Sequence, residues 1–428
     1  MSAVERSTNW LADAAAARGR ATALVDAAGE RLTYAELHER AAAAAAGAGA
    51  GDGLAVIELE PGLEHAIAVH AAMLAGRPLL TIRPALPATE REQVLAAARA
   101  TAPAPGTLAR VLSSGTTGAR RPIDLSFANF AASAASSAAN LGVAEDDLWL
   151  ACMPMDHVGG LSILIRSVIY GTAALVHPRF DTDAVAAALA SDDPRVTIVS
   201  LVPTQLRRLL DAGADLSRLR VALIGGAALD RETLDRAIEA GAPVVQSYGL
   251  TEACSQVCTL APEQAASHRG SSGRALPGIE VETGADGVIR VRGANVAAAS
   301  ADAEGWLRTG DLGRLDADGF LWVEGRADDV IVSGGENVAP EPIEALLEAQ
   351  PGVAEAAVIG LPDPEWGQRV VAIVVPGPDA EPGREALIEA CRRELAAPMV
   401  PKQVELAESL PRTGTGKLQR ARLRTELA

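Results

Sequence analysis

The chain has 428 residues, 49% of them hydrophobic, and a formal net charge of −17. Its length and apolar content suffice for a large buried core in two or three domains, and its acidity argues against nucleic acid or an anionic membrane as a general partner. An anionic ligand would therefore need a site that is locally basic or built from backbone N–H groups.

Cysteine usage and the first residues indicate the cellular setting. Cys152, Cys254, Cys258 and Cys391 are scattered in a pattern unlike a disulfide framework, and the pair at 254 and 258 lacks a second pair of zinc ligands. The first twenty residues carry charges throughout, which is unlike a signal peptide, and no apolar run is long enough to span a bilayer. We therefore expect a cytoplasmic protein without membrane insertion.

In the first two-thirds of the chain, apolar runs alternate with amphipathic stretches. We expect strands at residues 54–60, 195–202, 220–226 and 242–249, and helices at residues 203–213 and 230–241. The strand expected at 195–202 is apolar on both faces, as in a buried parallel strand, and Asp230 is the expected N-cap of the second helix. The Ala-rich segment 41–53 is interpreted as a helix end and a turn. This alternation predicts a parallel sheet covered by helices.

The pattern changes after about Gly273. Shorter strands punctuated by Gly and Asp follow, among them residues 287–293, and Asp316–Phe320 has the composition of a hairpin turn. The last hundred or so residues alternate strand and helix again. We expect a domain boundary near Arg326–Asp329.

The segment "VLSSGTTGARRP", residues 111–122, is rich in hydroxyl and glycine residues. The residues concerned are Ser113, Ser114, Gly115, Thr116, Thr117 and Gly118. The two glycines permit positive φ and close approach of the backbone to a ligand, and successive N–H groups in such a loop can bind an anion. The spacing is not that of a Walker A loop. By itself the segment is either an exposed turn or a phosphate cradle.

Three further residues lie in sequence contexts that fit a role in ligand binding. Glu252, in "SYGLTEACSQ", follows a predicted buried strand, where a carboxylate could hold Mg²⁺ against phosphates, although a surface Glu is the simpler reading. Asp311, between Gly310 and Leu312, is either a turn residue or an acceptor for ribose hydroxyls. Lys417, in "TGTGKLQR", is either a solvated tail residue or one that flanking glycines allow to enter a site.

These segments, in this order, closely resemble the adenylate-forming acyl- and aryl-CoA ligases over nearly the whole chain. The segment "LTYAELHERAAAAA" resembles the family's N-terminal helix, and "TGTGKLQR" resembles its final catalytic loop. Residues 153–172 and 246–263 resemble the o-succinylbenzoate–CoA ligases of menaquinone biosynthesis.

The resemblance implies an α/β fold in two parts. A large N-terminal domain, residues 1–326, would combine helix-covered, mostly parallel sheets with a β-rich subdomain. A small, mobile α+β domain, residues 327–428, would turn about a hinge near Asp328. The implied reaction is ATP-dependent conversion of a carboxylic acid to acyl-AMP, followed by transfer to CoA, with ATP, Mg²⁺ and CoA as the small-molecule partners.

Each site residue takes a role from this resemblance. Residues 113–118 would hold the β- and γ-phosphates, Thr251 would contact the α-phosphate, and Glu252 would carry Mg²⁺. Asp311 would bind the ribose, with Arg326 beside it. The remaining nucleotide contacts would be Gly225, Gly226, Ala227, Tyr248 and Gly249. Lys417 would bridge the acyl carboxylate and the phosphate.

The same resemblance indicates an acid pocket and a CoA channel. His157 would face the acid, and Ser255, Gln256 and Arg166 are candidates for the second carboxylate of a dicarboxylic substrate, because a buried carboxylate needs a partner. For Arg166 a surface charge on a helix is an equal alternative. The CoA channel would be lined by Ser333, Gly334, Gly335 and Glu336.

The sequence departs from the family where the phosphate loop normally continues with Pro-Lys-Gly. Here "ARRP" places Arg120 or Arg121 at the Lys position and lacks the later Gly. Arginine also neutralises phosphate, but as a rigid fork rather than a point charge. A ligase for another acid, a ligase that loads a carrier protein, and a degraded nucleotide-binding protein therefore stay as alternatives, and the oligomeric state, a homo-oligomer included, stays open.

Overall fold

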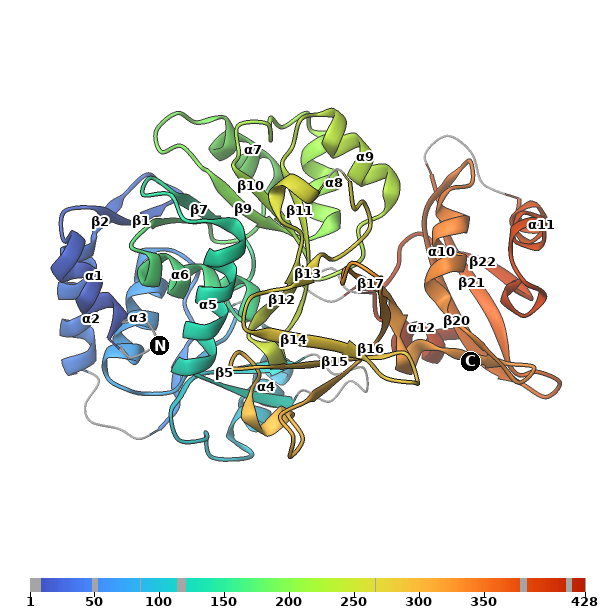
Figure 1. The fold of residues 1–428 in the computed structure, drawn as a ribbon, viewed down its shortest axis with the longest axis horizontal. Helices are drawn as coiled ribbons and strands as arrows, with labels where there is room; N and C mark the ends of the chain where they lie inside the picture. Colours follow the sequence, from blue (N-terminus) through green and yellow to red (C-terminus); the bar gives the residue numbers. More distant parts are fainter. Residues whose placement is uncertain are drawn as a thin grey trace.

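The computed structural model describes residues 9–47, 53–84, 86–113, 121–265, 267–377, 383–412 and 418–427. Within these residues the chain forms a large body built on three sheets and a smaller unit built on a fourth, which lies to one side in Figure 1. The predicted α/β class, with a β-rich subdomain and a C-terminal α+β domain, is confirmed.

The largest sheet has nine strands in the order β13-β12-β11-β10-β9-β7-β8-β1-β2. They are β1 (Thr22–Asp26), β2 (Arg31–Thr33), β7 (Leu148–Ala151), β8 (Ala173–Val176), β9 (Ile198–Leu201), β10 (Val221–Ile224), β11 (Val244–Leu250), β12 (Ser255–Thr259) and β13 (Arg274–Ala275). Neighbours from β11 to β1 pair in parallel, and β2, β12 and β13 are antiparallel additions at the edges. The carboxyl ends of the parallel strands therefore share one edge, where ligands bind in open α/β sheets.

Helices cover both faces of this sheet (Figure 1). One face packs on α1 (Trp10–Arg18), α2 (Tyr34–Gly47), α3 (Leu63–Leu74), α5 (Phe127–Leu141) and α6 (Val158–Tyr170). The other packs on α7 (Thr182–Ala190), α8 (Pro203–Asp211) and α9 (Arg231–Glu239). In β7, Trp149 and Ala151 enter the first core while Leu148 and Leu150 enter the second, which is the two-residue alternation of a strand.

A second sheet contains β3 (Ala55–Ile57), β4 (Leu79–Thr81), β5 (Thr107–Ser113) and β6 (Arg121–Ser126) in sequence order, with α4 (Ala88–Arg99) packed on β5 and β6. The first three strands are parallel, and β6 returns antiparallel to β5. The hydroxyl-rich segment of the sequence thus joins two paired strands. Ser126 then caps α5, in a capping box with Asn129.

The third sheet is antiparallel and holds β14 (Ile279–Thr283), β15 (Val288–Gly293), β16 (Leu307–Leu315) and β17 (Leu321–Arg326). The turn predicted at Asp316–Phe320 joins β16 to β17, with Gly319 at φ +81°. Short 3₁₀ turns are η1 (Thr251–Ala253), η2 (Pro262–Gln264), η3 (Ala298–Ser300), η4 (Ala327–Asp329) and η5 (Ala397–Met399).

The C-terminal unit is built on β18 (Ile331–Ser333), β19 (Glu336–Val338), β20 (Val353–Asp363), β21 (Gly367–Pro376) and β22 (Gln403–Leu406). Its helices are α10 (Pro340–Glu348), α11 (Arg384–Glu394) and α12 (Arg420–Leu427). Ile343 and Leu387, from the first two helices, enter the core on one face of the sheet, and Leu423 of α12 enters the core on the other. The unit has its own core, as an independent domain requires.

The predicted strands form, but with shorter bounds. The strand expected at 54–60 is limited to β3, and the one expected at 195–202 to β9. Asp230 is the N-cap of α9, and its side chain accepts a hydrogen bond from the backbone N–H of Thr233. None of the described helices is both long and apolar enough to cross a membrane. All four cysteines are buried free thiols.

Candidate active site

Glycines mark where β10 and β11 end side by side. A Cβ on Gly225 would lie 3.1 Å from the carbonyl oxygen of Ser247, and a Cβ on Gly249 would overlap the carbonyl oxygen of Ser255. Gly226 has φ +82° and is exposed together with Ala227. Only glycine allows main chain to approach this closely, and the exposed backbone of Gly226 and Ala227 lies directly beside this contact.

The turn that follows β11 carries Thr251 and Glu252. Its main chain is fixed from outside: the backbone N–H of Ala297 donates to the carbonyl oxygen of Glu252 at 2.8 Å, and the Asn295 amide donates to that of Ala253 at 2.9 Å. Both Thr251 and Glu252 are half-buried, and β6 packs against this turn. The turn therefore holds a hydroxyl and a carboxylate at the sheet edge, near the strand that leads out of the predicted phosphate loop.

Two consecutive non-glycine residues with positive φ end the turn. Cys254 has φ +51° and Ser255 has φ +90°. Such backbone is uncommon outside glycine and persists only where its surroundings enforce it. The hydroxyl of Ser133 on α5 donates to the carbonyl oxygen of Cys254 at 2.6 Å, and β12 then pairs back on β11. The sharp reversal sets Gln256 opposite Gly249.

Asp311 lies inside β16, directly across from Arg326 on β17, so the turn alternative from the sequence is wrong. Arg326 Nη1 donates to Asp311 Oδ1 at 2.7 Å, and the Tyr248 hydroxyl donates to Oδ2 at 2.6 Å. Burial, and after it the adjacent Asp311 carboxylate, raises the pKa of Tyr248 far above its usual value. A neutral phenol thus orients a carboxylate that keeps one lone pair on each oxygen for further donors.

Arg166 is buried in α6 with 3% of its surface exposed, so the alternative of a surface charge is wrong. Its Nη1 donates to Gln256 Oε1 at 3.0 Å, and its Nη2 donates to the Ser133 hydroxyl at 2.8 Å. Gln256 in turn donates to the Thr259 hydroxyl at 3.1 Å. Among the described residues no carboxylate forms an ion pair with Arg166. A buried charge that only neutral groups surround is costly, and an anionic ligand would offset that cost.

Ser133 was not predicted from the sequence. It joins the positive-φ turn to Arg166, and with the buried Ser136 and Ser137 it forms a polar stripe on α5. Hydroxyls at spacings of three and four on an otherwise apolar helix were the available signal.

His157 is the N-cap residue of α6, at the carboxyl end of β7. Its Nε2 lies 3.9 Å from Asp156 Oδ1, and Arg83 Nε donates to the other oxygen of Asp156 at 2.8 Å. Asp156 and His157 line a cavity of about 20 Å³ together with side chains from β4 and the end of β5. This volume fits a water molecule rather than an acyl group.

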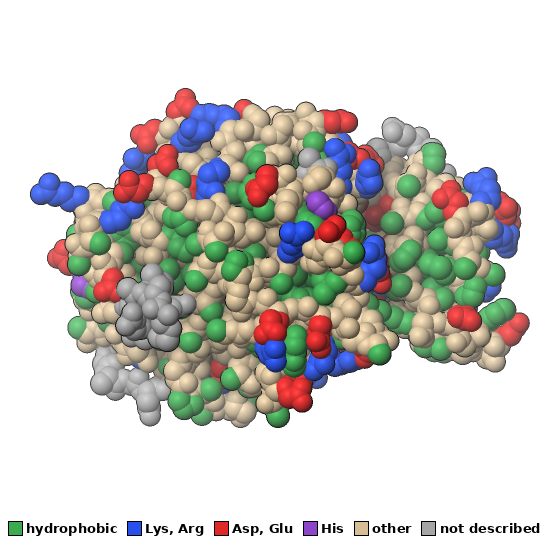
Figure 2. All heavy atoms as spheres, viewed as in Figure 1, with side chains coloured by type: hydrophobic (Ala, Val, Ile, Leu, Met, Phe, Trp, Pro, Cys, Tyr) green, Lys and Arg blue, Asp and Glu red, His purple; other side chains and the backbone are tan. Residues whose placement is uncertain are grey.

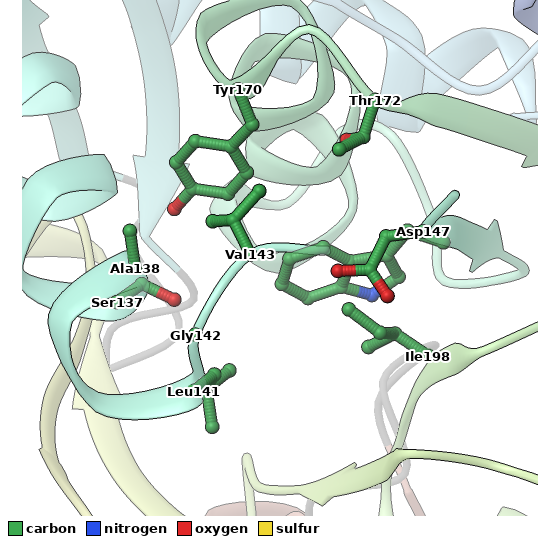
Figure 3. A pocket seen from close by; sticks show the side chains of 10 residues that line it. Ser137, Ala138, Leu141, Gly142, Val143, Asp147, Tyr170, Thr172 and Ile198 are labelled. Carbon is green, nitrogen blue, oxygen red and sulfur yellow. The ribbon is translucent and has the colours of Figure 1, made fainter. Parts of the chain in front are cut away.

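Another cavity, of about 10 Å³, lies beside the end of α5 (Figure 3). Asp147, Thr172 and Ile198 line it, and these residues stand at the starts of β7, β8 and β9. It therefore lies at the amino ends of the parallel strands, at the edge opposite Gly225 and Gly249.

The predicted hinge and CoA-channel residues lie in or next to the C-terminal unit. Asp328 belongs to η4, between β17 and β18, and Arg326 Nη2 lies 3.7 Å from its Oδ2. Ser333, Gly334, Gly335 and Glu336 form the tight hairpin from β18 to β19. Trp366, another residue absent from the sequence prediction, accepts a hydrogen bond from Gly334 N at its carbonyl oxygen and stacks beneath Lys402, whose Nζ is 4.4 Å from the ring centre.

Several predicted residues fall outside the described ranges. These are Ser114, Gly115, Thr116, Thr117, Gly118, Arg120 and Lys417. Ser113 is described at the end of β5, paired with the exposed Arg121, and its hydroxyl is 3.5 Å from the Arg121 carbonyl oxygen.

On the face shown in Figure 2, acidic and basic side chains are interspersed over both parts of the molecule.

Known proteins resemble this chain in sequence and architecture. The model of the AMP-binding enzyme family matches residues 11–105 and 102–299, and that of the AMP-binding enzyme C-terminal domain matches residues 342–417. A 2-succinylbenzoate–CoA ligase from Bacillus cereus is 42% identical over 335 residues, which are 73% of this chain and 69% of that protein. The ligase from Bacillus mycoides shows the same identity and coverage.

Solved structures agree. The o-succinylbenzoate CoA synthetase of Bacillus subtilis in complex with the acyl-adenylate intermediate has a TM-score of 0.86 at 33% identity, covering 97% of this chain and 98% of that one. The same synthetase in complex with ATP and magnesium ion has a TM-score of 0.87 at 32% identity, covering 97% and 99%. The chain therefore belongs to the AMP-binding enzyme family and is an adenylate-forming CoA ligase.

Proposed function

We propose that the chain activates o-succinylbenzoate with ATP and transfers the acyl group to CoA, as a step of menaquinone biosynthesis. The observation that carries the choice of acid is Arg166, a buried guanidinium whose described neighbours are all neutral. An acid with two carboxylates can be activated at one and bound through the other. The ligases from Bacillus bear the name of such an acid.

The chemistry requires two displacements. A carboxylate resists attack because its oxyanion is a poor leaving group. In the first step a carboxylate oxygen of the acid attacks the α-phosphorus of ATP, the bond to the bridging oxygen breaks, and pyrophosphate leaves. In the second step the CoA sulfur attacks the acyl carbon, and AMP leaves. Groups that stabilise negative charge on the phosphate accelerate the first step.

The nucleotide would bind along the carboxyl ends of β10 and β11. The adenine would lie against the backbone of Gly225, Gly226 and Gly249, with Ala227 and Tyr248 as further contacts. Asp311 would accept hydrogen bonds from the ribose hydroxyls on its remaining lone pairs, because Tyr248 and Arg326 already fix its orientation.

The phosphates would extend from the adenine and ribose toward Thr251 and the segment 113–118. The Thr251 hydroxyl would contact the α-phosphate. Glu252 fits a magnesium site of the kind that uses one carboxylate, with substrate phosphates and waters as the other ligands. The metal would supply charge neutralisation of the phosphates.

The acid would lie between Arg166 and His157. Arg166 and Gln256 would bind the carboxylate that is not activated, and Ser255 next to Gln256 supplies a further hydroxyl. A bidentate guanidinium–carboxylate pair is strong and directional, so it would also fix which carboxylate faces the phosphate. His157, at the end of β7, would border the reacting part of the acid.

Lys417 and the C-terminal unit would serve both steps. We propose boundaries at 1–326 and 327–428, with Asp328 as the hinge. Lys417 would bridge the acyl carboxylate and α-phosphate during adenylation. After rotation about the hinge, the hairpin Ser333–Glu336 would line the channel for CoA. Rotation of a small domain about a few residues at an element end is an established kind of switch.

The direct test measures both steps with purified protein. ATP–pyrophosphate exchange with o-succinylbenzoate reports adenylation, and thioester formation on adding CoA reports transfer. Exchange with other aryl or fatty acids but not this one would overturn the substrate. Transfer to the phosphopantetheine of a carrier protein but not to CoA would overturn the acceptor. ATP binding without exchange for any acid would favour the degraded nucleotide-binding protein.

A further inference from the structure

A cluster of buried charged side chains lies between the hinge turn η4 and the last helix, α12. Arg420, the first residue of α12, places both guanidinium ends on carboxylates: Nη2 donates to both oxygens of Glu344 at 2.7 and 2.8 Å, and Nη1 donates to Asp329 at 3.2 Å. Arg424, one turn later, donates to the other oxygen of Asp329 at 3.1 Å. We call these four residues the Arg420 cluster.

The cluster is a junction of three elements. Asp329 belongs to η4, next to the proposed hinge residue, while Glu344 lies on α10 and also accepts a hydrogen bond from the backbone N–H of Val358 on β20 at 2.7 Å. The side chains of Arg420, Asp329 and Glu344 are 12%, 12% and 13% exposed. Ion pairs this buried are held in one geometry, because loss of either partner leaves an uncompensated charge.

Apart from the Arg420 cluster, α12 is held by its packing on β20, which buries Leu423. The helix has eight residues, and only Leu423 among them is buried. An isolated helix of this length is unstable in water, so its orientation depends on tertiary contacts. Most of the polar contacts between α12 and other elements come from Arg420 and Arg424.

The described residues on either side of residues 413–417 are also held by hydrogen bonds. Arg412 donates to Glu355 of β20 at 2.6 Å, and it forms an antiparallel bridge with Leu418. The backbone N–H of Gln419 donates to the carbonyl oxygen of Pro411 at 2.8 Å. The described residues 411–412 and 418–419 are therefore joined to each other within the C-terminal unit, and Arg420 sets the direction in which the chain continues.

We propose that Arg420 is a positioning residue for adenylation: with Asp329 and Glu344 it joins η4, α10 and α12 into one rigid piece, so that the base of the segment carrying Lys417 keeps a fixed orientation relative to the hinge. This inference rests on the proposed function, in which Lys417 acts on the phosphate. The proposal predicts that loss of Arg420 slows adenylation more than thioester formation. Loosening the piece misplaces Lys417 in the first step, and the second step does not use that side chain.

The test compares the two half-reactions in Arg420→Gln and Glu344→Gln. We expect the adenylation rate to fall about 10- to 100-fold, a size typical of a misplacement near 1 Å. Thioester formation from preformed acyl-adenylate should change less than about twofold, well below that range. Arg422→Gln is the matched control, because Arg422 lies on the same helix but pairs with Glu426 in solvent. It should leave both steps unchanged.

Equal losses in both half-reactions, or no loss in either, would overturn the proposal. If Arg420→Gln fails to fold, Arg424→Gln, which removes one bond to Asp329, should show the same imbalance at smaller size. Amide hydrogen exchange gives a readout independent of activity: Arg420→Gln should speed exchange in η4 and α12 together and leave α11 unchanged. If wild type adenylates no acid, the proposed function fails, and the exchange result alone decides whether the rigid piece exists.

Discussion

Two arginines in different parts of the molecule have opposite surroundings: Arg166 is 3% exposed, and the side chain of Arg420 is 12% exposed. Arg420 has carboxylates of Asp329, Glu341 and Glu344 within 3.6 Å. Arg166 has only the neutral groups of Gln256 and Ser133 as hydrogen-bond partners among the described residues. The charge of Arg420 is compensated inside the chain, whereas that of Arg166 is left for a ligand.

From this difference we expect Arg420 to contribute to the stability of the fold and Arg166 to contribute to ligand binding. A buried ion pair is strongly destabilised when one partner is removed, because the other stays buried and charged. A buried charge without a counter-charge already costs free energy in the free protein, and its removal relieves that cost. We therefore expect the two arginines to respond in opposite ways to the same substitution.

The largest expected effect is on stability. Arg420→Gln leaves Glu344 without its cation and Asp329 with Arg424 alone. This should lower the free energy of unfolding of the C-terminal unit by about 3 kcal/mol. Denaturant unfolding measures this, with Arg422→Gln as the exposed control. A variant as stable as the wild type would show that the Arg420 cluster is not a compensated network.

The second effect is on substrate binding. Arg166→Gln should raise KM for o-succinylbenzoate by about 10- to 100-fold, since a hydrogen bond between charged groups contributes about 1.5–3 kcal/mol. The KM for ATP and the midpoint of thermal unfolding should not fall. Arg308→Gln, an exposed arginine paired with Asp286, controls for loss of a positive charge. A variant that unfolds more easily with an unchanged KM would place Arg166 with Arg420 as a structural residue.

His70 extends the comparison to a buried group that can lose its charge. Among the described residues neither ring nitrogen of this α3 side chain has a hydrogen-bond partner, and burial lowers the pKa of His70 from 6.5 to about 4. The folded state therefore disfavours protonation, so stability is complete above pH 6.5 and decreases as the pH falls toward 4. The decrease should reach about 3 kcal/mol. His70→Met should remove that part of the acid dependence, and an unchanged pH profile of unfolding in this variant would contradict the assignment.

Substitution of Glu341 should give the smallest change in the free energy of unfolding. Burial outweighs the attraction of Arg420, 3.6 Å away, and raises the pKa of Glu341 from 4.5 to about 7. The stability that the protonated form provides is complete below pH 4.5 and is lost as the pH rises through 7. Glu341→Gln should therefore stabilise the protein by about 1–2 kcal/mol at pH 8 and have no effect at pH 4. Equal effects at both pH values would show that the carboxyl is ionised throughout.

The sequence predicted those features that local chemistry determines. The buried strand at β9, the Asp230 cap and the turn at Asp316–Phe320 each follow from residue types a few positions apart, and the structure contains all three. Asp311 was harder, because the same "TGDLG" pattern suits a turn or a strand. Only its cross-strand partner Arg326 and the distant Tyr248 decide between them.

The state of Arg166 could not be predicted because it depends on tertiary packing. α5, α6 and β12 come together only in the folded sheet, and each contributes one polar group to the contact. The same holds for Ser133, whose role requires the positive-φ turn after β11. Helical spacing places Arg166 on one face of α6 but does not indicate whether that face meets solvent or core.

The central claim is that Arg166 holds one carboxylate of a dicarboxylic acid while the other is activated. ATP–pyrophosphate exchange should be measured for the wild type with o-succinylbenzoate and with an analogue that keeps the activated carboxylate and lacks the other one. We predict that kcat/KM for the diacid exceeds that for this monoacid by about 100-fold, and that Arg166→Gln removes most of this preference. A monoacid turned over as efficiently as the diacid by the wild type would contradict the account.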